Sequence, residues 1–196
     1  MKHNSERLFL NPFEDYSESN LLLIGIAGFV ISITISYFGK IVFDGIIQVH
    51  VGATSLIAII LGNLSNTVIL TFGLFILAKI LYKNARFVDI LNNILIARIP
   101  MLFSGLLVVW MAKLIPMGKT TKDEISFVAS LDQSDMLWIA FLALFLLFMM
   151  VYFFYLLVVG IRHSINSKKF GHGFLIVVIV FVLDGLALLV YREFFI

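Results

Sequence analysis

The sequence contains no cysteine, which excludes disulfide bonds, thiolate metal ligands, iron–sulfur clusters and cysteine nucleophiles. It is also poor in charge, because Asp, Glu, Lys and Arg make up only 13% of its 196 residues. A soluble domain carries about a quarter charged residues. With 61% of the residues apolar, the remaining polar groups cannot cover a water-soluble globule of this size. We therefore expect an integral membrane protein.

Catalytic and cofactor-binding signatures are missing as well. The sequence has no Gly-x-Ser-x-Gly elbow, no phosphate-binding glycine loop and no two-histidine zinc motif. An intramembrane hydrolase gathers several charged side chains at one depth, whereas here only Asp184 lies deep in an apolar run. A net charge of +2 is too small to indicate nucleic-acid binding. We expect no enzyme activity, no cofactor, no metal site and no nucleic-acid partner.

Long hydrophobic runs dominate what is present. A membrane-spanning helix needs about 20 mostly apolar residues. Five stretches qualify, at about 21–38, 56–81, 101–115, 136–159 and 174–190. The third is short and could begin within the segment before it. The expected fold is an all-α, polytopic membrane helical bundle of five transmembrane helices over residues 21–196, after a polar tail of residues 1–20.

Two connections between the expected spans are too apolar for plain loops. Residues 87–99 repeat apolar side chains at helical spacing, which predicts a surface amphipathic helix at the membrane. Residues 41–55 are apolar but carry Asp44, Gln48 and His50. They could form an interfacial helix, an extension of the first span or a sixth crossing. We favour the first two, because a sixth crossing would disturb the charge distribution described next.

Lysine and arginine positions predict the orientation in the membrane, because they concentrate on the cytoplasmic side. With five spans and the N-terminus inside, the inner side holds Lys2, Arg7, Lys79, Lys83, Arg86, Arg98, Arg162, Lys168 and Lys169. The outer side holds Lys40, Lys113, Lys119, Lys122 and Arg192. The first twenty residues lack the pattern of a cleavable signal peptide. We expect a cytosolic N-terminal tail and an outer C-terminus.

A candidate intramembrane polar site centres on Asp184. An aspartate at the middle of a membrane helix costs about 2.5–3.5 kcal/mol on insertion scales, so it faces protein or water. In the expected topology Asn63 and Asn66 lie at a similar depth and could hydrogen-bond to Asp184. One interpretation is a proton- or cation-linked site. The favoured one is a structural contact that locks helices together.

A stripe of small residues marks the first span. Gly25, Gly28, Ser32 and Ser36 lie on one helical face, where another helix can approach closely. We favour packing inside the protein over packing against a partner's helix.

Basic residues near the expected membrane surface are candidates for lipid-headgroup contacts. They are Arg86, Arg98, Arg162, Lys168 and Lys169. Long basic side chains reach lipid phosphates from such positions. Metal binding by the neighbouring His163 and His172 is the less favoured alternative.

The chain resembles the YIP family, membrane proteins named for interaction with Ypt and Rab GTPases, in its bacterial branch. Asn11-Pro12 lies in the polar lead-in, Arg98-Ile99-Pro100 enters the third span, and Tyr155-Leu156-Leu157-Val158-Val159-Gly160-Ile161 ends the fourth. The resemblance implies a five-span fold with a cytosolic N-terminus. Eukaryotic members have a longer cytosolic segment and an Asp-Leu-Tyr-Gly-Pro motif, and they bind prenylated GTPases in vesicle traffic. This chain has neither feature, so GTPase binding is doubtful and a bacterial cytoplasmic membrane is the expected location.

Together these features predict a non-enzymatic membrane scaffold or accessory subunit. Its expected partners are the lipid bilayer and either other membrane proteins or further copies of the chain. The alternative is a small transporter or channel component that uses Asp184.

Overall fold

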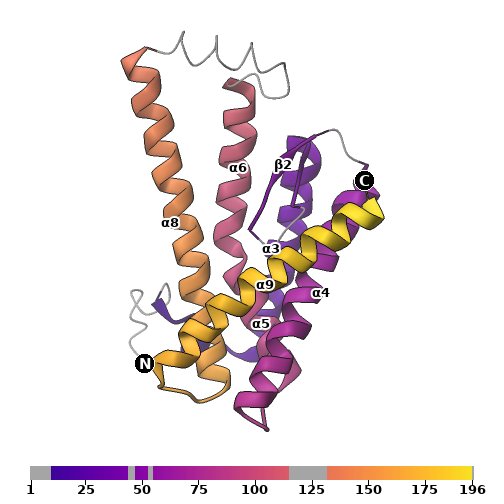
Figure 1. Ribbon diagram of the computed structural model, residues 1–196, viewed down its shortest axis with the longest axis vertical. Coiled ribbons are helices and arrows are strands. Elements are labelled where there is room, and N and C mark those ends of the chain that lie inside the picture. Colours follow the sequence, from indigo (N-terminus) through magenta and orange to yellow (C-terminus); the bar gives the residue numbers. More distant parts are fainter. Residues whose placement is uncertain (1–9, 44–46, 53–54, 115–131, 196) are drawn as a thin grey trace.

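The computed structural model describes residues 10–43, 47–52, 55–114 and 132–195. Long helices run up and down through the molecule in alternating directions (Figure 1). They are α3 (Glu18–Gly39), α4 (Leu56–Leu81), the consecutive pair α5 (Phe87–Ala97) and α6 (Ile99–Leu114), α8 (Gln133–Ser164) and α9 (Phe170–Phe195). One end of the bundle, here named the α2 end, carries the short helix α2 (Pro12–Asp15) and the α4–α5 and α8–α9 turns. The other, the hairpin end, carries strands β1 (Ile41–Val42) and β2 (His50–Val51).

Five helical segments of the described chain are long and apolar enough to cross a bilayer. They are Glu18–Gly39, Leu56–Leu81, Phe87–Met111, Met136–Ser164 and Phe170–Glu193. The shortest would be about 33 Å long at 1.5 Å per residue, enough for a hydrocarbon core of roughly 30 Å. The all-α, five-span prediction is confirmed.

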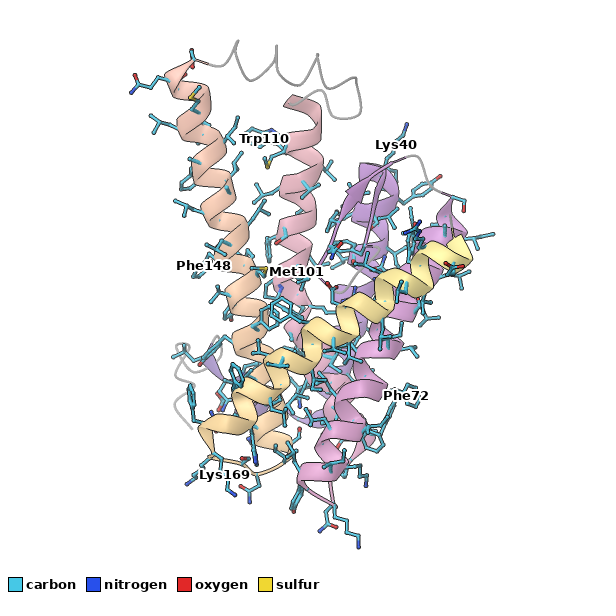
Figure 2. All side chains as sticks on the ribbon, in the orientation of Figure 1. Lys40, Phe72, Met101, Trp110, Phe148 and Lys169 are labelled. Atoms are coloured by element: carbon cyan, nitrogen blue, oxygen red, sulfur yellow. The ribbon has the colours of Figure 1, made fainter. Side chains whose placement is uncertain are left out.

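The outer surface of the bundle is apolar. Large side chains such as Phe38 and Phe170 are 80% and 87% exposed. Figure 2 shows Phe72 and Phe148 on opposite flanks of the bundle, and Lys40 and Lys169 toward its two ends. Lipid tails would cover such flanks, because a soluble monomer rarely leaves apolar patches of this extent open to water.

Helix α5 lies in the interior, which corrects the prediction of a surface amphipathic helix over residues 87–99. It packs against α3, α4 and α8, and Ile90 and Ile94 are fully buried. Its polar residues find partners inside the protein: Asn92 Nδ2 donates to the Glu18 carbonyl at 3.1 Å and Asn93 Nδ2 donates to Ser164 Oγ at 2.7 Å. The third span therefore begins at Phe87 and contains α5 as well as α6.

The third span is interrupted at Arg98, between α5 and α6. Pro100 has no backbone N–H, so it cannot continue the hydrogen-bond ladder of α5. Arg98 keeps a right-handed helical backbone (φ −74°, ψ −12°), and its N–H still reaches the Ile94 carbonyl. Pro100 thus lies inside a span, at a helix break, rather than at the edge of a span.

The connection between α3 and α4 also differs from its prediction. In place of an interfacial helix or an extended first span, its described residues form a two-stranded antiparallel pair, with Ile41 opposite Val51 and Val42 opposite His50. Lys40 turns the chain back with a left-handed backbone (φ 51°). Ile41, Val42 and Phe43 are at most 3% exposed, so this strand lies within the bundle. We call residues 41–43 and 47–52 the hairpin segment.

Candidate functional site

An arginine reaches from the helix break into the protein interior. Nη1 of Arg98 donates to the Asn63 carbonyl at 3.3 Å and to the Thr67 hydroxyl, and Nη2 donates to Asn63 Oδ1 at 3.4 Å. The same Oδ1 accepts from Ser32 Oγ at 3.3 Å. The Arg98 cluster, formed by Ser32, Asn63, Thr67 and Arg98, therefore joins α3, α4 and the α5–α6 break. The guanidinium of Arg98 thus binds neutral oxygens of α4, in place of the lipid phosphates predicted from the sequence.

The space around the Arg98 cluster is small. A cavity of about 20 Å³ is lined by Ser32, Phe43 and Arg98 among others, which is room for one water molecule. A cavity of this size does not admit a larger solute.

A second polar contact holds the hairpin segment. Asp184 of α9 is 5% exposed. Its Oδ1 accepts from the Ile47 N–H at 3.1 Å and its Oδ2 from Gln48 Nε2 at 3.3 Å. From α4, Asn66 Nδ2 donates to the Phe43 carbonyl at 2.7 Å. Helices α4 and α9, which pack side by side, thus both bind the hairpin segment.

These anchors lie deep in the bundle. Asn66 is ten residues from the start of α4 and Asp184 eleven from the end of α9, which is about 15–17 Å from the hairpin end at 1.5 Å per residue. That is about half the thickness of a hydrocarbon core. Non-helical backbone is tolerated at such depth only where protein surrounds it, because lipid offers no hydrogen bonds. Asp184 and Asn66 supply the polar partners that this part of the backbone needs.

The structure divides the three predicted site residues between two places. Asp184 and Asn66 meet at the hairpin segment, while the side chain of Asn63 belongs to the Arg98 cluster. Sequence reasoning missed Gln48 as a partner of Asp184. The signal was its polar amide within the otherwise apolar 41–55 connection.

The small-residue stripe of α3 contacts α5 and α6. A Cβ atom placed on Gly25 would lie 2.5 Å from Leu95 Cβ, and one on Gly28 would lie 3.2 Å from Ile99 Cγ1. Ser32 and Ser36 are also buried. All four positions therefore face the interior of the bundle.

The basic residues predicted to contact lipid headgroups differ in whether their side chains bind other groups of the protein. Arg86 forms ion pairs with Glu18 at 2.7 Å and Asp89 at 2.6 Å, and hydrogen bonds to Asp89 and then Glu18 raise the pKa of Arg86 above its ordinary value. Arg162 Nε donates to the Ser167 carbonyl at 3.2 Å. Lys168 and Lys169 are exposed in the α8–α9 turn. Arg86 therefore links the starts of α3 and α5, and the two lysines are the more accessible cations.

These features define a class, a multi-pass membrane protein whose helices and hairpin segment are joined by buried polar contacts. A family model for the Yip1 domain matches residues 14–192, nearly the whole chain. The chain belongs to the Yip1 family, a family of non-enzymatic membrane proteins, as the resemblance indicated. Comparisons with curated proteins and with solved structures found no significant match.

Proposed function

We propose that this protein is a non-enzymatic membrane scaffold or accessory subunit in a bacterial cytoplasmic membrane. The observation that carries this proposal is that buried polar side chains on different helices bind one another and the hairpin segment. Arg98 is bonded to Asn63 and Thr67, and Asp184 to the Ile47 N–H and the Gln48 amide. An interior joined in this way suits a rigid body that presents its surface to partners.

The apolar flanks support partners within the bilayer. Helix α8 exposes Leu137, Trp138, Phe141, Leu144 and Phe148 along its first half. The partners we propose are lipids together with another membrane protein or a second copy of the chain. A prenylated GTPase is not proposed, because the Asp-Leu-Tyr-Gly-Pro motif of the eukaryotic members does not occur in this sequence.

The proposed orientation puts the α2 end in the cytosol. Among the described residues this end carries Lys79, Lys83, Arg86, Arg162, Lys168 and Lys169, whereas the hairpin end carries Lys40, Lys113 and Arg192. An excess of Lys and Arg favours the cytoplasmic side. The C-terminus then lies outside.

The alternative, a small transporter or channel component, depends on Asp184. A buried carboxylate at mid-depth is what a coupled transporter needs. Here the carboxylate accepts hydrogen bonds from the hairpin segment, so it would have to release them to take up a proton or cation. That requirement favours the scaffold.

The experiment that tests the proposal is gentle extraction of the tagged full chain, with co-purifying proteins identified against an unrelated multispan control. A stoichiometric protein partner, or a defined homo-oligomer that moves no solute, is the expected result. In parallel, the purified protein and Asp184→Asn are reconstituted in vesicles for flux assays. Solute flux by the wild-type chain that Asp184→Asn abolishes without unfolding would contradict the scaffold and establish the transporter.

A further inference from the structure

Two adjoining pockets at the α2 end differ sharply in polarity. One is polar, has a volume of about 290 Å³, and is lined by Glu18, Arg86, Asp89, Asn92 and His163 among others. It lies where α3 and α5 begin and α8 ends, so in the proposed orientation it is at the cytosolic membrane surface.

The second pocket is an apolar groove of about 610 Å³ that continues from the polar one toward the middle of the bundle. Its lining includes Pro100 and Phe103 of α6 and Met149 of α8. Tyr16 and Leu21 line both pockets, so the two pockets are neighbours. A polar pocket beside an apolar groove suits an amphiphile, with a headgroup in the pocket and an acyl chain in the groove.

Asn92 shows what kind of headgroup the polar pocket would hold. The side chain is 2% exposed, and its Nδ2 donates to the Glu18 carbonyl at 3.1 Å. A carbonyl accepts only from the amide nitrogen, so this bond settles which way the amide faces. Asn92 Oδ1 is then a buried acceptor with no partner among the described residues. Because a buried unpaired acceptor is unfavourable, a ligand that donates an N–H or O–H there is favoured.

The charges of the polar pocket indicate further which kind of headgroup it would bind. Two carboxylates, Glu18 and Asp89, face one guanidinium, so the acidic side chains of the lining outnumber its guanidinium groups. Arg86 uses Nε and Nη2 for these carboxylates, and within the described chain its Nη1 makes no hydrogen bond. The pocket therefore offers acceptors and negative charge for an ammonium, beside a guanidinium nitrogen for a phosphate.

We propose that the two pockets together bind one phosphatidylethanolamine-type lipid. The ammonium donates to Asn92 Oδ1 beside Glu18 and Asp89, the phosphate accepts from Arg86 Nη1, and an acyl chain fills the apolar groove. A choline headgroup has no N–H to donate. A glycerol or serine headgroup leaves the lipid with a net negative charge beside two carboxylates. This proposal rests on the membrane-scaffold function and names a lipid that the scaffold holds.

The test measures which lipids stay with the purified full-length chain. The protein is reconstituted in bilayers of equal parts ethanolamine, choline and glycerol phospholipids, extracted in mild detergent, and analysed by native mass spectrometry. We expect about one ethanolamine lipid per chain, enriched at least fivefold over the choline lipid. Equal retention of the three lipids would overturn the proposal, because it describes only a non-specific lipid shell.

Two nearby positions on α8 give a matched pair of variants for the groove. Met149 lines it, whereas Leu147 is 51% exposed and does not. Met149→Trp should reduce ethanolamine-lipid retention at least fivefold, and Leu147→Trp should leave it unchanged. Equal effects of the two substitutions would overturn the assignment of the groove as the binding site of the acyl chain.

The headgroup contact is tested with Asn92→Leu, which should bring the ethanolamine-to-choline ratio close to one. Glu18→Gln tests the charge independently and should raise retention of the glycerol lipid relative to ethanolamine. An unchanged lipid ratio in both folded variants would overturn the proposal, and Glu18→Gln decides alone if Asn92→Leu does not fold. Lipid retention is measured separately from protein co-purification, so this proposal and the scaffold function can fail independently.

Discussion

Among the described residues, the Arg98 cluster and the contacts of Asp184 and Asn66 are polar contacts that join different kinds of structure. The Arg98 cluster links helices to one another, and most of its bonds run between side chains. Asp184 and Asn66 instead bind the hairpin segment, largely through its backbone. Helical backbone groups are already paired within each helix, whereas a non-helical segment in a membrane must find partners elsewhere. We infer that the hairpin contact is the more costly of the two to remove.

The largest loss of stability is expected from Asp184→Ala. It leaves the Ile47 N–H and the Gln48 amide without their acceptor in a partly buried setting, which costs about 2 kcal/mol. The free energy of unfolding in detergent micelles measures this loss. Glu193→Ala, an exposed position on the same helix, is the matched control and should unfold like the wild type. Wild-type stability in Asp184→Ala would remove the basis of the comparison.

Asn66→Leu should cost somewhat less, about 1–2 kcal/mol, because it removes the donor to one buried carbonyl, that of Phe43. The neighbouring Ser65 hydroxyl bonds only carbonyls of its own helix, so Ser65→Ala should have little effect. The same unfolding assay applies to both variants. If Ser65→Ala destabilised the protein as much as Asn66→Leu, the anchor from α4 would have no special role.

Within the Arg98 cluster, Thr67→Val keeps the side-chain shape but removes the hydroxyl that accepts from Arg98. Side-chain hydrogen bonds between membrane helices contribute about 0.6 kcal/mol on average and at most about 1.7, so we expect a loss near 1 kcal/mol. Thr34→Val is the control, because the Thr34 hydroxyl bonds the Val30 carbonyl of its own helix on an exposed face. A loss larger than that of Asp184→Ala would reverse the order of the two contacts.

The smallest effect is expected from Arg86→Ala at the α2 end. Its ion pairs with Glu18 and Asp89 are exposed, and exposed pairs add little to stability. The unfolding transition should stay close to that of the wild type at both low and high salt. A clear destabilisation at low salt that vanishes at high salt would contradict this prediction. It would show that the ion pairs of Arg86 stabilise the fold despite their exposure.

The five spans could be predicted from the sequence because hydrophobic length is a local property. The burial of α5 in the interior could not be predicted in this way. Asn92 and Asn93 indicated a stripe facing water, because their partners Glu18 and Ser164 lie 74 and 71 positions away in the sequence. The hairpin segment was missed for the same reason. Ile47 and Gln48 are 137 and 136 positions from Asp184, and no local pattern joins them.

The contacts of Arg98 could not be predicted from the sequence either, although its partners lie closer in the chain. Because Arg98 follows an amphipathic pattern, the sequence predicts that its side chain contacts lipid phosphates. Its acceptors on α4 lie 31 and 35 positions earlier in the chain, where two helices must first fold together before the contact exists. Burial of a charge is a tertiary property, which a single sequence does not display.

The central claim is that Asp184 holds the hairpin segment inside the bundle, and the cysteine-free chain allows a direct test. Val42 is 3% exposed, so Val42→Cys should resist a membrane-impermeant thiol reagent in the wild-type background. Gly52→Cys, at an exposed position with open space around it, is the positive control. We predict that adding Asp184→Ala makes Val42→Cys reactive while the helical bundle persists. Equal labelling of Val42→Cys with and without Asp184→Ala would contradict the claim.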